Sequence, residues 1–291
     1  MRIGIGLPTV IPGVPGEIVL EWARRAERRG FGTLGVIDRI AYPNYEPLTA
    51  LAAAAGATTT IDLMTDVLLG PTRDPVLLAK QAAGLNRLSG GRFTLGLGVG
   101  ARPDDFAVVG RDFHARGREW DAALEVMDLV WQGEAPAGTT RTSAPVVGGG
   151  GRPRLLFGGS SDASIRRTVR WGAGWTASSS AGDALPGLVE RVRTAWREAG
   201  RDGRPWISVL TYFAAGDGPE DGRDDPRAAD FVIDYYGPQR GPALAAGLPR
   251  TADALRAMVR RYGDLGVDEV VVFPTLPEPD QVDRLADAVL G

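Results

Sequence analysis

Residues 92–100 read Arg-Phe-Thr-Leu-Gly-Leu-Gly-Val-Gly, a buried-strand pattern with glycine at every second position of its second half. They follow Leu-Ser-Gly-Gly at 88–91, which is typical of a helix end. Glycine weakens a strand, so Gly96, Gly98 and Gly100 indicate that something approaches this backbone closely. Either a flat cofactor or the packing of a narrow barrel interior would account for the pattern.

Strand-like and helix-like segments alternate along the chain on both sides of this stretch. The apolar runs, bounded by Gly, Pro, Asp or Ser, predict buried parallel strands, and helical periodicity fills the intervals between them. The strands are predicted at 3–7, 33–37, 63–69, 93–97, 155–157, 174–177, 207–213 and 269–273, and helices at 19–29, 46–57, 75–88, 163–172, 184–199 and 252–265. This alternation predicts the α/β class and one (β/α)8 TIM barrel domain over residues 1–291.

Two connections are longer than a barrel needs. Residues 104–134 predict a short helix, a turn and a second helix at 118–132, followed by a Gly-, Pro- and Thr-rich segment. An irregular segment at 216–227 precedes a predicted helix at 228–236. We expect mobile loops near 135–154 and 216–247, and such loops often cover an active face.

Composition excludes several classes of protein. The net charge is −3, which gives no footprint for nucleic acid or an anionic membrane. No apolar run is long enough to cross a bilayer, and the N-terminus enters a strand pattern without a signal-peptide pattern. The absence of cysteine suits a cytoplasmic protein.

Few side chains are available for ordinary catalysis. His114 is the only histidine and no cysteine is present, so a zinc site of the usual kind cannot form and no metal is expected. Lys80 is the only lysine and lies in a helical pattern, which argues against a Schiff base. We therefore expect a bound cofactor to carry the chemistry.

The predicted strand ends are rich in glycine, hydroxyl groups and arginine. After the fifth strand, Gly158-Gly159-Ser160-Ser161 opens a helix that contains Ser164. Free N–H groups at a helix start, with serine hydroxyls beside them, would bind a phosphate. The alternative is a glycine turn with an ordinary helix cap.

Other polar residues at the predicted barrel mouth have two interpretations. Asp38 and Arg39 directly follow the second strand and would contact a cofactor or substrate, or else form a salt bridge between loops. His114 and Tyr212 are weaker candidates for proton transfer. Tyr235-Tyr236 would line a pocket or belong to the core.

Taken together, these motifs resemble the bacterial luciferase-like monooxygenase superfamily of flavin- or F420-dependent oxidoreductases. The most specific match runs from Leu-Leu-Gly-Pro-Thr-Arg-Asp-Pro at 68–75 to the glycine-rich strand at 92–100. Supporting matches lie at Gly30-Phe31, Asp38-Arg39, Arg116-Gly117 and from Gly158 to Trp175. The resemblance extends over nearly the whole chain.

The resemblance implies a luciferase-like TIM barrel that binds FMN or coenzyme F420 at its carboxyl-terminal mouth. By position, Asp66–Val67 matches a non-proline cis peptide under the ring. The implied cofactor contacts are Asp66, Val67, Gly98, Val99, Gly100, Ala101, Gly158, Gly159, Ser160, Ser161 and Ser164, with Asp38 and Arg39 as candidate catalytic residues. A small-molecule substrate, electrons from NAD(P)H or a partner reductase, and a homodimer are also implied.

The chain departs from the pattern of the superfamily at several positions. Arg39 stands where several members have an active-site histidine, and Val99 where luciferases have a phosphate-binding arginine, although Arg102 is near in sequence. Ala101 replaces an acidic residue of the F420-dependent sugar-phosphate dehydrogenases, which disfavours that activity. Asp66, where small residues are common, would place a carboxylate close to the ring.

The function expected from the resemblance is oxygenation through a C4a-peroxyflavin with FMN, or hydride transfer with F420. The alternatives are a flavin-binding protein without turnover and a cofactor-free barrel lyase.

Overall fold

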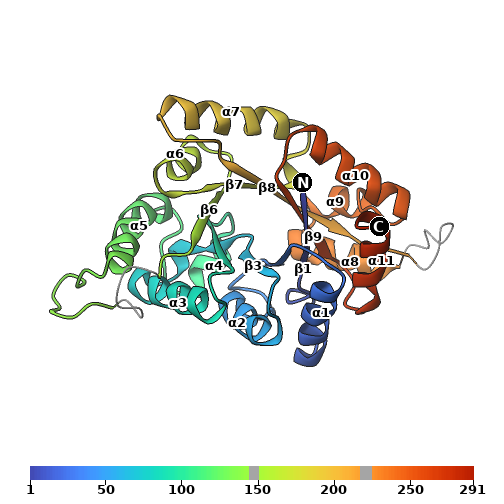
Figure 1. Ribbon diagram of the computed structural model, residues 1–291, viewed down its shortest axis with the longest axis horizontal. Coiled ribbons are helices and arrows are strands. Elements are labelled where there is room, and N and C mark those ends of the chain that lie inside the picture. The colour runs from blue at the N-terminus through green and yellow to red at the C-terminus, as the bar shows by residue number, and fades with distance from the viewer. Residues whose placement is uncertain (144–150, 217–224) are drawn as a thin grey trace.

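The computed structural model describes residues 1–143, 151–216 and 225–291, which form a parallel barrel surrounded by helices (Figure 1). The strands follow the order β3-β2-β1-β9-β8-β7-β6-β5-β4, and a further pairing of β3 with β5 closes the barrel. They are β1 (Arg2–Gly6), β2 (Thr33–Val36), β3 (Asp62–Thr65), β4 (Leu68–Leu69), β5 (Phe93–Gly98), β6 (Arg154–Gly158), β7 (Gly174–Ser178), β8 (Trp206–Phe213) and β9 (Glu269–Pro274). The predicted TIM barrel is confirmed.

The third barrel strand differs from the prediction because it is interrupted. Sequence predicts one strand over 63–69, whereas the structure divides it into β3 and β4. Met64 pairs with Thr94 and Leu68 with Leu97, so three residues of this strand face two of β5. This is a one-residue β-bulge, a feature that re-aims side chains. The Asp66–Val67 peptide bond within it is cis, as the resemblance predicts.

The bulge explains two of the alternating glycines. A Cβ on Gly96 would lie 2.0 Å from the carbonyl oxygen of Thr65, and one on Gly98 would lie 2.6 Å from Val67 Cγ2. The Thr65 hydroxyl also donates a 2.7 Å hydrogen bond to the Gly96 carbonyl. Close packing inside the barrel therefore accounts for Gly96 and Gly98 without a ligand.

Most helices surround the barrel in chain order (Figure 1), whereas the helix at 226–236 packs against residues of the barrel interior. They are α1 (Gly16–Arg28), α2 (Pro47–Ala57), α3 (Pro75–Leu88), α4 (Pro103–Ala107), α5 (Arg116–Gln132), α6 (Asp162–Trp171), α7 (Leu185–Glu198), α8 (Pro226–Tyr236), α9 (Gly241–Ala246), α10 (Ala252–Asp264) and α11 (Asp280–Val289), with short 3₁₀ turns η1 (Gly70–Thr72) and η2 (Ser179–Ala184). The sequence-based ranges agree within a few residues, but α9 and α11 were not predicted.

The two predicted loops are described only in part. Residues 135–143 and 151–153 carry no helix or strand, and α8 and α9 occupy much of 225–247. The remainder of the predicted loops, 144–150 and 217–224, lies outside the described residues. The predicted mobility stays a prediction.

Alternate strand residues form two apolar layers. Outward residues such as Ile5, Leu63 and Val272 pack in the larger cluster between barrel and helices. Inward residues such as Met64 and Val271 pack in a second cluster inside the barrel. At its amino end the interior is polar, where Arg2 forms an ion pair with Asp62 at 2.8 Å. In the described parts of the chain, no helix has the length and apolarity to cross a membrane.

Replacing Gly96 tests whether the bulge depends on the missing side chain. We expect Gly96→Ala to lower the free energy of unfolding by about 2–3 kcal/mol or more, because its Cβ would overlap a backbone oxygen that cannot rotate away. Gly84→Ala is the matched control. Gly84 lies in α3 with open space around its would-be Cβ, so alanine should be neutral or stabilise by up to about 1 kcal/mol. Urea unfolding midpoints measure both, and equal midpoints would contradict the packing account.

Candidate active site

The carboxyl ends of the strands bring most of the sequence-predicted polar residues to one end of the barrel. Parallel barrels build their active sites at this end. Asp38 and Arg39 follow β2, and the bulge residues Asp66 and Val67 lie between β3 and β4. Gly98 ends β5 and residues 99–101 follow it, and the Gly158–Ser161 turn begins at the last residue of β6.

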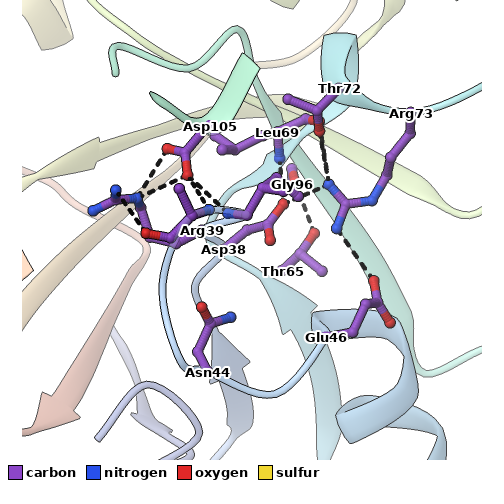
Figure 2. Close-up of polar contacts among 12 residues, drawn as sticks. Asp38, Arg39, Asn44, Glu46, Thr65, Leu69, Thr72, Arg73, Gly96 and Asp105 are labelled. Atoms are coloured by element: carbon purple, nitrogen blue, oxygen red, sulfur yellow. Dashed lines mark hydrogen bonds and ion pairs between the residues drawn. The ribbon is translucent and has the colours of Figure 1, made fainter. Parts of the chain in front are cut away.

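Asp38 is held by the loop after the third strand. Its Oδ2 accepts hydrogen bonds from the Leu69 N–H at 2.9 Å and from Arg73 Nη1 at 2.6 Å (Figure 2). The Asp38 side chain is almost fully buried, and burial raises its pKa although the Arg73 guanidinium opposes that rise. Its Oδ1 is buried and has no hydrogen-bond partner among the described residues. One oxygen of Asp38 therefore joins two loops, and the other can accept a further hydrogen bond.

Arg39 forms a buried ion pair with α4. Its Nε lies 2.9 Å from Asp105 Oδ2 (Figure 2). Its Nη2 lies 2.9 Å from Asp104 Oδ2. Asp105 Oδ1 also accepts hydrogen bonds from the N–H groups of Ile40 and Ala41, each at 2.8 Å. The salt-bridge interpretation of Arg39 therefore describes its contacts. A direct role in chemistry stays a prediction.

Asp66 and Val67 both belong to the barrel interior. Asp66 Oδ1 accepts a 2.7 Å hydrogen bond from the Thr176 hydroxyl on β7, with β5 and β6 lying between the two strands. This bond crosses the barrel, so the Asp66 side chain points inward. Val67 packs against the glycine positions of β5 and β6, since a Cβ on Gly158 would lie 3.0 Å from Val67 Cγ1.

Tyrosines of β8 and α8 lie near this end of the interior. The hydroxyls of Tyr212 and Tyr236 are 2.6 Å apart. Tyr235 is buried, with the guanidinium of Arg102 5.0 Å from the centre of its ring. Burial raises the pKa of Tyr212 well above its ordinary value. Arg102 also donates to the Tyr235 carbonyl at 2.7 Å, so it is directed to α8 in this structure.

The turn after β6 has features of both sequence interpretations. Ser161 caps α6, because its hydroxyl accepts from the Ser164 N–H at 3.2 Å. Gly159 has a φ of +113°, and a Cβ there would lie 2.5 Å from Ser164 Oγ. Ser160 and Ser161 are exposed at the start of a ten-residue helix. The N–H groups of a first helical turn have no intrahelical partner, so an anion can bind there.

The remaining candidates are placed less centrally. Gly100 has a φ of +75° and adjoins the Phe106 ring, while Val99 is half-buried and Ala101 is exposed. His114 is exposed and its ring contacts Phe113. His114 is therefore a surface residue in this structure.

Sequence reasoning did not single out several residues that organise the site. Arg73, Asp105 and Thr176 are the partners of Asp38, Arg39 and Asp66. Arg73 lies inside the motif that carries the family resemblance, which was the available signal. Asp105 and Thr176 are distant in sequence from their partners, and nothing in the local pattern indicates the pairing.

No cluster of three or more metal-binding side chains occurs in the described part of the chain. Two open hollows lie at the opposite, amino end of the barrel. One, of about 730 Å³, is lined by residues that include Arg152, Arg170 and Arg201. Neither hollow is lined by any of the predicted site residues.

Comparison with known proteins identifies the family. A family model described as luciferase-like monooxygenase matches residues 1–276. The chain belongs to this family. An uncharacterised protein of Mycobacterium tuberculosis is 32% identical over 222 residues, which cover 65% of this chain and 75% of that protein.

Two solved structures have the same fold as this chain. A monooxygenase of Streptomyces bottropensis aligns with a TM-score of 0.79 at 20% identity, covering 100% of this chain and 99% of its own. An F420-dependent secondary alcohol dehydrogenase, solved with an F420–acetone adduct, aligns with a TM-score of 0.80 at 18% identity, covering 99% of this chain and 98% of its own. At these identities the likeness shows the fold.

Asp104 and Asp105 both bind Arg39, which allows a matched test of stability. Asp105 is buried and accepts from Arg39 and two backbone N–H groups, so we expect Asp105→Ala to cost about 3–5 kcal/mol of unfolding free energy. Asp104 binds the same arginine from an exposed position, so Asp104→Ala should cost about 1 kcal/mol or less. Chemical denaturation measures both. Similar losses for the two variants would show that the buried network contributes no more than a surface ion pair.

Proposed function

We propose that this chain is a flavin- or deazaflavin-dependent oxidoreductase that binds FMN or coenzyme F420 at the carboxyl end of its barrel and acts on a small organic substrate. The observation that carries the proposal is the presence, at one end of a luciferase-like barrel, of two complementary features. One is the serine-bearing start of α6, and the other is a pair of buried carboxylates with free oxygens, Asp38 and Asp66. Membership of the family supports the oxidoreductase class.

The residues present fit such a cofactor. A phosphate would bind at Gly159, Ser160, Ser161 and Ser164, where helix N–H groups and hydroxyls converge. The ring would lie against Val67, Gly158 and residues 98–101. It would be beside the unpartnered carboxylate oxygens of Asp38 and Asp66. Val99 offers no charge, and Arg102 is engaged by α8, so the phosphate would depend chiefly on the serines.

When bound, the cofactor would supply either oxygenation of the substrate with O2 or hydride exchange with it. The chain's own residues bind and orient the reactants and exclude water. Asp38 and Arg39 take the role of polar groups facing the ring or substrate, and their ion pairs with Arg73 and Asp105 keep both at fixed positions. Electrons from NAD(P)H or a reductase, and a homodimeric assembly, belong to the same proposal.

The cofactor's phosphate provides a direct test of the site. We expect Ser160→Ala to weaken FMN binding about 10- to 100-fold, because a hydrogen bond to a charged group contributes about 1.5–3 kcal/mol. Riboflavin, which lacks the phosphate, should bind the wild type and Ser160→Ala equally. Fluorescence titration measures both affinities. For the deazaflavin, the same comparison is made between F420 and its chromophore without the phosphate. If the wild type binds neither FMN nor F420, the proposal is wrong and a cofactor-free barrel gains support.

A second candidate function is cofactor binding without turnover. It is favoured by the engagement of the Arg39 guanidinium with Asp104 and Asp105, which reduces its freedom to act on a substrate. Electron transfer distinguishes the two. We expect the protein to accelerate hydride transfer from reduced F420 to members of a ketone and aldehyde panel, or from members of an alcohol panel to oxidised F420. With reduced FMN and O2, we expect it instead to accelerate oxygenation of members of the ketone and aldehyde panel. Tight binding with no acceleration by any member of the panel would favour the second candidate.

A further inference from the structure

Asp66 is a buried acid near the carboxyl end of the barrel interior, and one of its oxygens has no hydrogen-bond partner among the described residues. Its side chain points inward, since Oδ1 accepts from Thr176 on the opposite side of the barrel at 2.7 Å. Oδ2 is buried and has no hydrogen-bond partner among the described residues. The next residue, Val67, packs on Gly98 and Gly158 beside it. The bulge therefore presents a carboxyl group on the same surface as the proposed ring site.

Burial is the main cause that disfavours the ionised form of Asp66, and the titratable groups around it modify this effect. Glu269 acts on it from β9, and Tyr236 of α8 is close enough for its own pKa to be raised by Asp66. Tyr212 of β8 is hydrogen-bonded to Tyr236. Asp38, which follows β2, forms an ion pair with Arg73. Burial raises the pKa of Asp66 to about 7, Glu269 adds to the rise, and the Thr176 hydroxyl opposes it.

A purely structural role does not explain this arrangement. A buried polar atom without a partner destabilises a fold, because it loses its hydrogen bonds to water and gains none. The Thr176 hydroxyl needs only one acceptor, which Oδ1 supplies. The free oxygen is therefore a cost to the unliganded protein, and a ligand that bonds to it would remove that cost.

We propose that Asp66 holds a proton for the cofactor, donating a hydrogen bond from its neutral carboxyl to a carbonyl or ring nitrogen of the bound isoalloxazine or deazaflavin. This rests on the proposed function. The pyrimidinedione edge of both rings is rich in acceptor atoms, so the neutral acid complements it. The ionised carboxylate would instead face those acceptors with a like partial charge and would also be shielded from water by the ring.

The proposal predicts how affinity depends on pH. Because the bound ring favours neutral Asp66, the pKa of this group is higher in the complex than in the free protein. Affinity is then constant below the free pKa and falls as pH rises through it, by up to about tenfold per pH unit. Asp66→Asn keeps the shape and a donor N–H but cannot ionise, so its affinity should not fall.

The experiment is a titration of wild type, Asp66→Asn and Asp62→Asn with oxidised FMN and oxidised F420 between about pH 5.5 and about pH 8.5. Asp62→Asn is the matched control, since it makes the same change in the same strand, at the amino end of the barrel. We expect the dissociation constants of wild type and Asp62→Asn to rise at least about tenfold between pH 6.5 and pH 8.5 relative to those of Asp66→Asn. The phosphate of FMN titrates in all variants, so it cancels in this comparison.

A second measurement needs no cofactor. Infrared difference spectra of the free protein across the same pH range should contain a protonated-carboxyl band that titrates near neutral pH. This band should be absent from Asp66→Asn and present in Asp62→Asn.

The outcomes separate the two proposals. Parallel pH profiles for wild type and Asp66→Asn, or a titrating carboxyl band whose intensity is the same in Asp66→Asn as in wild type, would overturn the role of Asp66 while leaving cofactor binding intact. Failure of the wild type to bind either cofactor at any pH would overturn the proposed function itself. Loss of folding in Asp66→Asn, detected by circular dichroism, would contradict the proposal as well, because it would show that the carboxylate is structural.

Discussion

The close approach of the third strand to β5 is the constraint on which the rest of this site depends. The Thr65 carbonyl occupies the space where residue 96 would carry its Cβ. Only glycine permits this approach, and the approach lets three residues of one strand face two of the next. The resulting bulge turns Asp66 and Val67 into the barrel, where regular alternation would send one of them outward.

Ion pairs then hold the loops around this interior. Asp38 connects the end of β2 to Arg73 after η1, and Arg39 connects it to α4 through Asp105. The carboxylate is buried in both pairs, whereas Arg39 is buried and Arg73 is half-buried. Asp38 also accepts from one backbone N–H group and Asp105 from two. The loops are therefore fixed before any ligand binds. The same contacts limit what Arg39 can do, because its guanidinium is already bound to Asp104 and Asp105.

The barrel was predictable from sequence because its parallel strands are short apolar runs that are bounded by turn residues. The glycine alternation at 92–100 correctly indicated a close approach, but the sequence left open what approaches. A local pattern records only that space is needed at Gly96 and Gly98. The occupant, Thr65–Val67, comes from a neighbouring strand, and the interruption of that strand leaves no signal in its apolar run.

The site was predictable at the level of its positions and not of its pairings. Strand ends identified Asp38, Arg39 and the serine turn, and the family resemblance identified Asp66–Val67. Thr176 and Asp105 meet their partners across 110 and 66 positions of sequence, and such contacts depend on barrel closure and on a helix in an insertion. Tertiary contacts of this kind carry no periodic signature.

The central claim is that the bulge and the start of α6 together form one cofactor site. A crystal structure of the protein grown with FMN or with F420 tests it most directly. The account predicts the ring against Val67, within hydrogen-bond distance of Asp66 Oδ2, and the phosphate at Ser160, Ser161 and Ser164. A cofactor bound instead in the arginine-lined hollow at the amino end of the barrel, with Asp66 Oδ2 still unpartnered, would contradict it.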